Sequence, residues 1–180
     1  MINVEYEGKQ YPIRNTMKEI TIEEMEMITY ELSGDVKILD AWFNILESLS
    51  VDTNVIENID IETFSELIKS FDFKTKSPIQ KTIIIDGVEY HCYEGDSFKL
   101  KMKTLNKILD IITYSEHFYI ARIAALLYKR DDYSELENND PSHLKYKEEF
   151  FKTQPADIIM DVISQVNDKV MKKLITTGGI

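Results

Sequence analysis

The stretch INVEYEGKQYPI, residues 2–13, alternates apolar and polar residues around a glycine at position 8. A second stretch, TIIIDGVEYHCY at residues 82–93, repeats this arrangement around Asp86-Gly87. Short alternating runs that flank a glycine turn are typical of β-hairpins, and Asp-Gly is a strong hairpin signal. Pro12 has no amide hydrogen to donate, so its strand should lie at a sheet edge. The sequence therefore predicts two short hairpins.

The hydrophobic period changes to that of a helix after each hairpin. Thr21 and Glu24 match a Thr-x-x-Glu capping box, and the apolar stripe behind them ends at Gly34. Asp60 and Thr104 precede further stripes of helical spacing. Other stripes of this kind cover residues 36–49, 117–130 and 155–174. The sequence thus predicts an α+β fold that is mostly helical and carries two short β-hairpins.

The stretch KTKSPIQK, residues 74–81, interrupts the apolar period with lysines and a proline. We interpret it as a connector between an acidic hairpin-plus-helices unit at 1–73 and a second hairpin-plus-helices unit at 82–180. A shift of 79 positions places Gly8 on Gly87 and Tyr11 on Tyr90. This similarity fits an internal duplication, and it fits equally the chance likeness of two ordinary hairpins.

Negative charge is concentrated in the first unit. Residues 1–72 carry 16 acidic and 5 basic side chains, a net charge of −11, whereas residues 73–180 carry 16 of each. A field of this sign repels phosphate backbones, so we expect no direct nucleic-acid binding. It would attract a basic partner, or simply keep the protein soluble.

The residues that usually carry out catalysis or bind metals do not form a motif. Cys92 is the single cysteine and the chain has three histidines, which matches no usual zinc pattern. Phosphate-binding glycine loops and nucleophile elbows are missing from the sequence. We therefore expect no enzyme activity, no metal and no cofactor.

The chain also lacks the marks of export or membrane insertion. Its first residues, MINVE, have neither the basic start nor the apolar core of a signal peptide, and no apolar run approaches the roughly 20 residues of a membrane span. We expect a protein that is not secreted, does not bind membranes and works in a cytosol-like compartment.

One basic cluster alternates with apolar residues at 98–103. On a strand, Lys99, Lys101 and Lys103 would share one face. Such a face suits a strand edge protected by lysines, a nucleic acid or an acidic partner, or a contact with the acidic unit of this chain or of a second copy.

Two pairs of segments resemble bacteriophage proteins. The hairpin at 2–13 followed by ITIEEMEM at 20–27, and IAALLYKR at 123–130 followed by FFKTQPAD at 150–157, are similar to segments of phage tail and baseplate assembly proteins. That group includes the tail assembly chaperones and the baseplate-hub assembly proteins of T-even-like myophages. The resemblance implies a protein without catalytic residues that acts in the host cytoplasm during assembly, or that stays in the virion.

The leading functional hypothesis is a structural or chaperone-like protein that binds another tail or baseplate protein. The alternative is a small acidic adaptor, including a DNA-mimicking inhibitor of a host protein. A homo-oligomer fits either hypothesis. We expect the partner to bind acidic side chains exposed on the first helix, namely Glu23, Glu24, Glu26 and Glu31.

Overall fold

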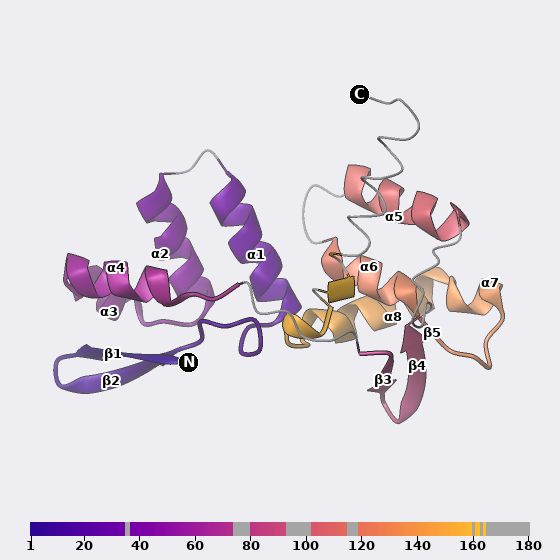
Figure 1. Cartoon of the computed structure of the whole chain (residues 1–180), viewed down its shortest axis with the longest axis horizontal. Coiled ribbons are helices and arrows are strands. Elements are labelled where there is room, and N and C mark those ends of the chain that lie inside the picture. Colours follow the sequence, from indigo (N-terminus) through magenta and orange to yellow (C-terminus); the bar gives the residue numbers. More distant parts are fainter. Residues whose placement is uncertain are drawn as a thin grey trace.

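A computed structural model of the chain has a mixed α+β architecture, as the sequence predicts (Figure 1). The structure describes residues 1–34, 37–73, 80–92, 102–114, 119–159, 161–162 and 164. Most of the predicted connector at 74–81 and most of the predicted last helix lie outside the described residues.

Both predicted hairpins are present, and each turns through two residues with positive φ. Strand β1 (Ile2–Tyr6) pairs with β2 (Lys9–Ile13), and β3 (Thr82–Ile85) pairs with β4 (Val88–Cys92). The turn residues Glu7-Gly8 and Asp86-Gly87 have φ angles of 50°, 71°, 50° and 79°. Type I′ hairpin turns require this pair of angles, which explains the glycine at the second position. Within the two-stranded sheet β1–β2, Pro12 lies on an edge strand as expected.

Four helices follow the first hairpin. They are α1 (Ile22–Ser33), α2 (Ile38–Ser48), α3 (Thr53–Asn58) and α4 (Ile61–Ser70). The predicted capping box forms, since Glu24 N donates to Thr21 Oγ1 and Thr21 N donates to Glu24 Oε2. Asp60 caps α4. The short helix α3 was not predicted.

The second hairpin gains a third strand that the sequence analysis missed. Helix α5 (Met102–Tyr114) precedes α6 (Ile120–Leu127), and the chain then extends as β5 (Tyr128–Lys129) along β4. The short helix α7 (Glu135–Asn138) and the longer α8 (Pro141–Lys152) follow, and the described residues 157–159, 161–162 and 164 are also helical. The prediction that one helix runs to residue 130 is therefore wrong, because residues 128–129 pair with a strand.

The interpretation of residues 98–103 as a strand with three lysines on one face is wrong at Lys103. Lys103 belongs to α5, whereas Lys99 and Lys101 lie outside the described residues. A helix rather than a strand at Lys103 removes the alternation that would have put it beside the other two lysines.

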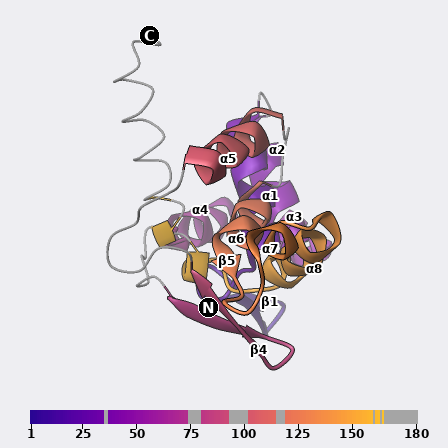
Figure 2. The same ribbon diagram turned by 90° about the vertical axis from the view of Figure 1, so that its right-hand side faces the viewer.

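One core joins the two predicted units. Helix α1 packs on α6 and α8, which lie beside it in Figures 1 and 2. The segment 154–157 also runs along residues 17–22, where Ile22 N donates to Gln154 O and Ala156 N to Ile20 O, both at 2.9 Å. Ile20 and Ile22 are fully buried at this junction. Buried apolar residues from both units form a single cluster.

None of the described helices is both long and apolar enough to cross a membrane.

Candidate partner-binding surfaces

The four predicted binding carboxylates have different environments. Glu23 is exposed. Glu24 is half-buried and accepts from both Arg14 guanidinium NH2 groups, at 3.0 and 2.6 Å. Glu31 accepts from Asn44 Nδ2 at 3.0 Å and so ties α1 to α2. The expectation of an exposed row of acids is correct for Glu23 alone.

Glu26 contradicts the expectation most clearly, because only 6% of its surface is exposed. Its Oε1 accepts from the backbone N–H of Ile120 at the start of α6, and its Oε2 has no hydrogen-bond partner. Position 26 follows Ile22 by one helical turn, so it shares the buried face of α1. This spacing is the sequence signal that Glu26 faces the core. Burial raises the pKa of this carboxyl to about 7, against the opposing effect of the Ile120 N–H.

We expect Glu26→Gln to stabilise the protein by about 2 kcal/mol above pH 7. The carboxyl has a pKa of about 7 in the folded protein against an ordinary 4.5, so the native state binds more protons between these pH values. Stability should therefore fall as pH rises from about 4.5 to about 7 and then level off. Urea denaturation at several pH values measures this.

The matched control is Glu23→Gln, three residues earlier on the exposed face of α1. It should keep the pH dependence of the natural protein. If the stability of Glu26→Gln changed with pH as that of the natural chain does, Glu26 would not be a buried carboxyl with a raised pKa.

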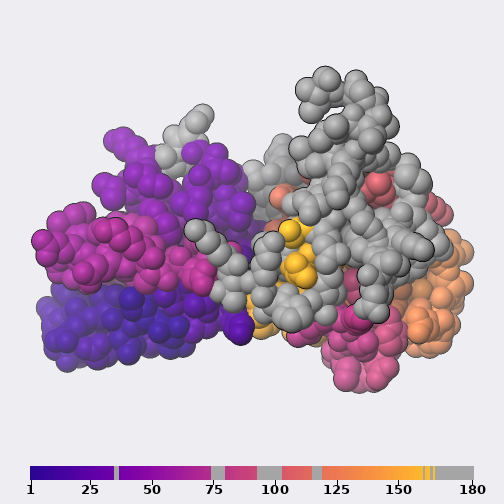
Figure 3. All heavy atoms as spheres, in the orientation of Figure 1, coloured from indigo at the N-terminus to yellow at the C-terminus, as the bar shows by residue number. Residues whose placement is uncertain are grey.

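The end of α1 and the start of α2 expose apolar side chains, and we call this surface the α1–α2 tip. It comprises Tyr30, Leu32, Ile38 and Leu39, whose exposed fractions are 45%, 41%, 61% and 57%. Leu32 and Leu39 belong to the apolar stripes of helical spacing that end at Gly34 and cover residues 36–49. In the structure the tip projects from the N-terminal half (Figure 3). Side chains with core-like spacing are thus left on the surface.

Acidic residues neighbour the α1–α2 tip in the sequence. Glu31 lies between Tyr30 and Leu32, and Asp40 follows Leu39 and is exposed. Glu23 lies farther down α1. A surface with exposed apolar side chains and nearby acids suits a partner with apolar and basic groups.

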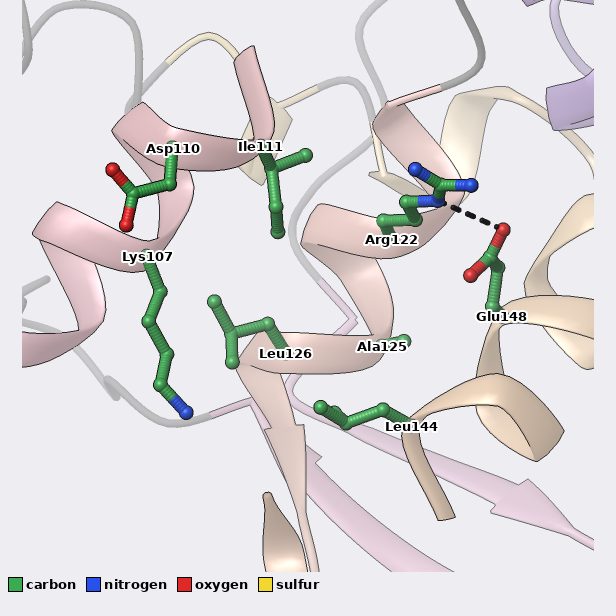
Figure 4. Close-up of a pocket in the computed structure, with 8 residues that line it drawn as sticks. All are labelled: Lys107, Asp110, Ile111, Arg122, Ala125, Leu126, Leu144 and Glu148. Carbon is green, nitrogen blue, oxygen red and sulfur yellow. Dashed lines mark hydrogen bonds and ion pairs between the residues drawn. The ribbon is translucent and has the colours of Figure 1, made fainter. Parts of the chain in front are cut away.

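A second candidate surface is a groove of about 270 Å³ between α5, α6 and α8. In Figure 4 the apolar side chains of Ile111, Leu126 and Leu144 converge from these three helices. Arg122 and Glu148 form an ion pair at 3.2 Å on one side of it. The apolar floor suits an apolar side chain. The sequence analysis did not find this groove, because its residues come from separate helices.

A buried lysine was also missed. Lys147 has no exposed surface, and its Nζ donates to Tyr128 O at 2.7 Å. Burial, followed by the nearby charge of Lys129, lowers the pKa of Lys147 to about 7. Its position between Leu144 and Phe151 at spacings of three and four is the signal that it faces inward. Because the ammonium group is enclosed, we assign it to the core.

Metal ligands do not converge within the described part of the chain, where no three His, Cys, Asp or Glu side chains are placed to hold an ion. Cys92 is buried. His117 lies outside the described residues. Comparisons of the chain with protein families, with curated proteins and with solved structures returned no match.

Proposed function

We propose that this chain is a non-enzymatic binding protein that holds another protein during assembly of a phage tail or baseplate. The assignment to phage assembly rests on the sequence resemblance at residues 2–27 and 123–157. The binding role is supported by the α1–α2 tip, where apolar side chains of helical spacing remain exposed. Apolar surface of this kind on a folded domain marks contact sites for other proteins.

Charge defines the partner further. Residues 1–72 carry a net charge of −11, and the α1–α2 tip lies within this segment. A basic partner would be attracted over distances of about 8–10 Å at physiological salt, which speeds its encounter with the tip. The apolar side chains would then hold it by burying surface. The partner should therefore combine basic residues with an apolar patch.

The alternative, a DNA-mimicking inhibitor, has less support. A mimic needs rows of exposed carboxylates along one face. On α1, Glu26 is buried and Glu24 is paired with Arg14. A mixed apolar and acidic surface suits a partner protein with an apolar patch better than the basic nucleic-acid-binding site that a DNA mimic would occupy.

The test uses purified tail and baseplate proteins encoded beside the gene for this chain. We expect one of them to bind the natural chain, and Ile38→Ser with Leu39→Ser to weaken that binding about tenfold by removing apolar contact area. The melting temperature should stay nearly unchanged, because both side chains are more than half exposed. Binding is measured by biolayer interferometry.

The matched control replaces two other exposed isoleucines, Ile61→Ser with Ile84→Ser, whose exposed fractions are 70% and 62%. This variant should bind like the natural chain. Association should also slow as salt rises, while dissociation changes less. Failure of every tail and baseplate protein to bind would refute the proposal, and equal losses in both double variants would refute the role of the tip.

A further inference from the structure

Besides the groove between α5, α6 and α8, the C-terminal half contains another pocket, which is separate from the α1–α2 tip. It has a volume of about 560 Å³ and lies between the loop after β5, helix α7 and the first half of α8. Its walls include the rings of Tyr133, His143 and Tyr146 and the carboxylates of Glu137 and Asp140. Aromatic rings and acids therefore meet in one cavity.

The rings form a preorganised aromatic cluster. His143 lies 5.2 Å from Tyr133 and 6.4 Å from Tyr146, measured between ring centres. His143 also stacks on the buried Tyr90, with 5.7 Å between the ring centres. The ring of Tyr146 is fixed by a residue outside the pocket, because its hydroxyl donates to Oδ2 of Asp86, in the turn of the second hairpin, at 2.5 Å. A ligand would meet rings that are already in place.

The two acids are ionised at neutral pH. Hydrogen bonds from Ser134 and from Ser142 hold the pKa of Glu137 and of Asp140, respectively, below the usual range. Burial, helped by the charges of Lys147 and Arg130, lowers the pKa of His143, so its ring is neutral. The pocket therefore presents two negative charges beside uncharged ring faces.

The nearby cations are already engaged. Arg130 donates to both carboxylate oxygens of Asp132, at 2.8 and 2.5 Å. Lys129 bonds to Glu135, and Lys147 is buried and donates to Tyr128 O. Arg130 also lies over the ring of Tyr133, with its guanidinium carbon 3.9 Å from the ring centre. The chain thus already places a guanidinium on one of the rings that line the pocket.

We propose that this pocket binds an arginine side chain of a partner protein. The face of an aromatic ring attracts cations, and a carboxylate pairs with the two parallel N–H groups of a guanidinium. Arginine is favoured over lysine because its planar group can stack on a ring while it bonds to an acid. The site is separate from the α1–α2 tip and would add a specific contact to the general attraction of the acidic half.

The direct test titrates the full chain with N-acetyl-arginine methylamide and follows the ring resonances of Tyr133 and His143 by NMR. Saturable shifts with a dissociation constant in the millimolar range are expected for a single side chain. N-acetyl-citrulline methylamide has almost the same shape without the charge. It should bind about fivefold more weakly or worse, because it lacks the cation.

The carboxylates are tested with Glu137→Gln and Asp140→Asn together. Both replacements keep an oxygen that can accept the helix-capping hydrogen bonds, so circular dichroism should stay unchanged. Binding of the arginine probe should fall about fivefold. The matched control, Glu62→Gln with Glu66→Gln, removes two exposed acids from α4 and should leave binding as it is.

Equal binding of the two probes, undiminished binding by the carboxylate variant, or no saturable shift would overturn the proposal. The variant Ile38→Ser with Leu39→Ser should bind the arginine probe normally. Its behaviour separates this pocket from the α1–α2 tip, so either proposal can fail without the other.

Discussion

Replacing Trp42 with alanine is expected to lower the free energy of unfolding by about 3–5 kcal/mol. The indole is only 8% exposed and belongs to the common core. Its ring centre lies 5.2 Å from that of Phe71, which in turn lies 5.6 Å from that of Phe73. Truncation would leave a cavity and remove the first of these aromatic contacts, so both transfer and packing energy would be lost.

The measurement is urea denaturation followed by far-ultraviolet circular dichroism, since Trp42 is the single tryptophan and the variant has no indole fluorescence. Leu39→Ala is the matched control, because Leu39 lies one turn earlier on α2 and is 57% exposed. It should change stability by less than about 0.5 kcal/mol. If the two variants unfolded at similar urea concentrations, Trp42 would not be a core anchor.

Replacing Lys147 with methionine is expected to raise stability at pH 7 by about 3 kcal/mol. The lysine has a pKa of about 7 in the folded protein, well below its ordinary 10.5, because burial disfavours the charged form. Between these pH values the unfolded chain binds more protons, so the stability of the natural protein should rise with pH. Methionine fills a similar volume without a charge. The expected gain of about 3 kcal/mol already includes a loss of about 1 kcal/mol for the missing hydrogen bond to Tyr128 O.

Denaturation curves between pH 7 and 10 measure both effects. The rise in stability with pH should largely disappear in Lys147→Met. Lys145→Met is the control, because Lys145 lies two residues earlier on α8 and is exposed. It should keep the pH slope of the natural protein. A Lys147→Met protein that is less stable at pH 7 would show that the ammonium group contributes more by bonding than it loses by burial.

Features set by neighbouring residues were predictable from the sequence. Glycine at the second turn position fixed both hairpins, and the Thr21–Glu24 box fixed the start of α1. Each depends on interactions within a few residues, so the pattern alone suffices. The short helix α7 also begins with a capping box, Ser134 with Glu137, which the sequence analysis did not find.

Features set by distant residues were not predictable. Strand β5 exists because β4, more than 30 positions earlier, offers an edge to Tyr128 and Lys129. The hydrogen bond that Glu26 accepts comes from the start of α6, and only the tertiary structure places that N–H group beside it. The exposure of Leu39 likewise reflects how many helices pack around α2. A hydrophobic period reports that a side chain could be covered, but only the tertiary structure decides whether it is.

The pairing of residues 17–22 with 154–157 affects how the protein emerges during synthesis. Ile22 N and Ile20 O find their partners in a segment that the ribosome makes more than 130 residues later. At about 5–20 residues per second, this delay lasts on the order of 10 s. Throughout that time the nascent first half carries an unsatisfied edge beside two isoleucines that are fully covered in the finished protein. Completion of the N-terminal core therefore waits for translation to pass residue 157.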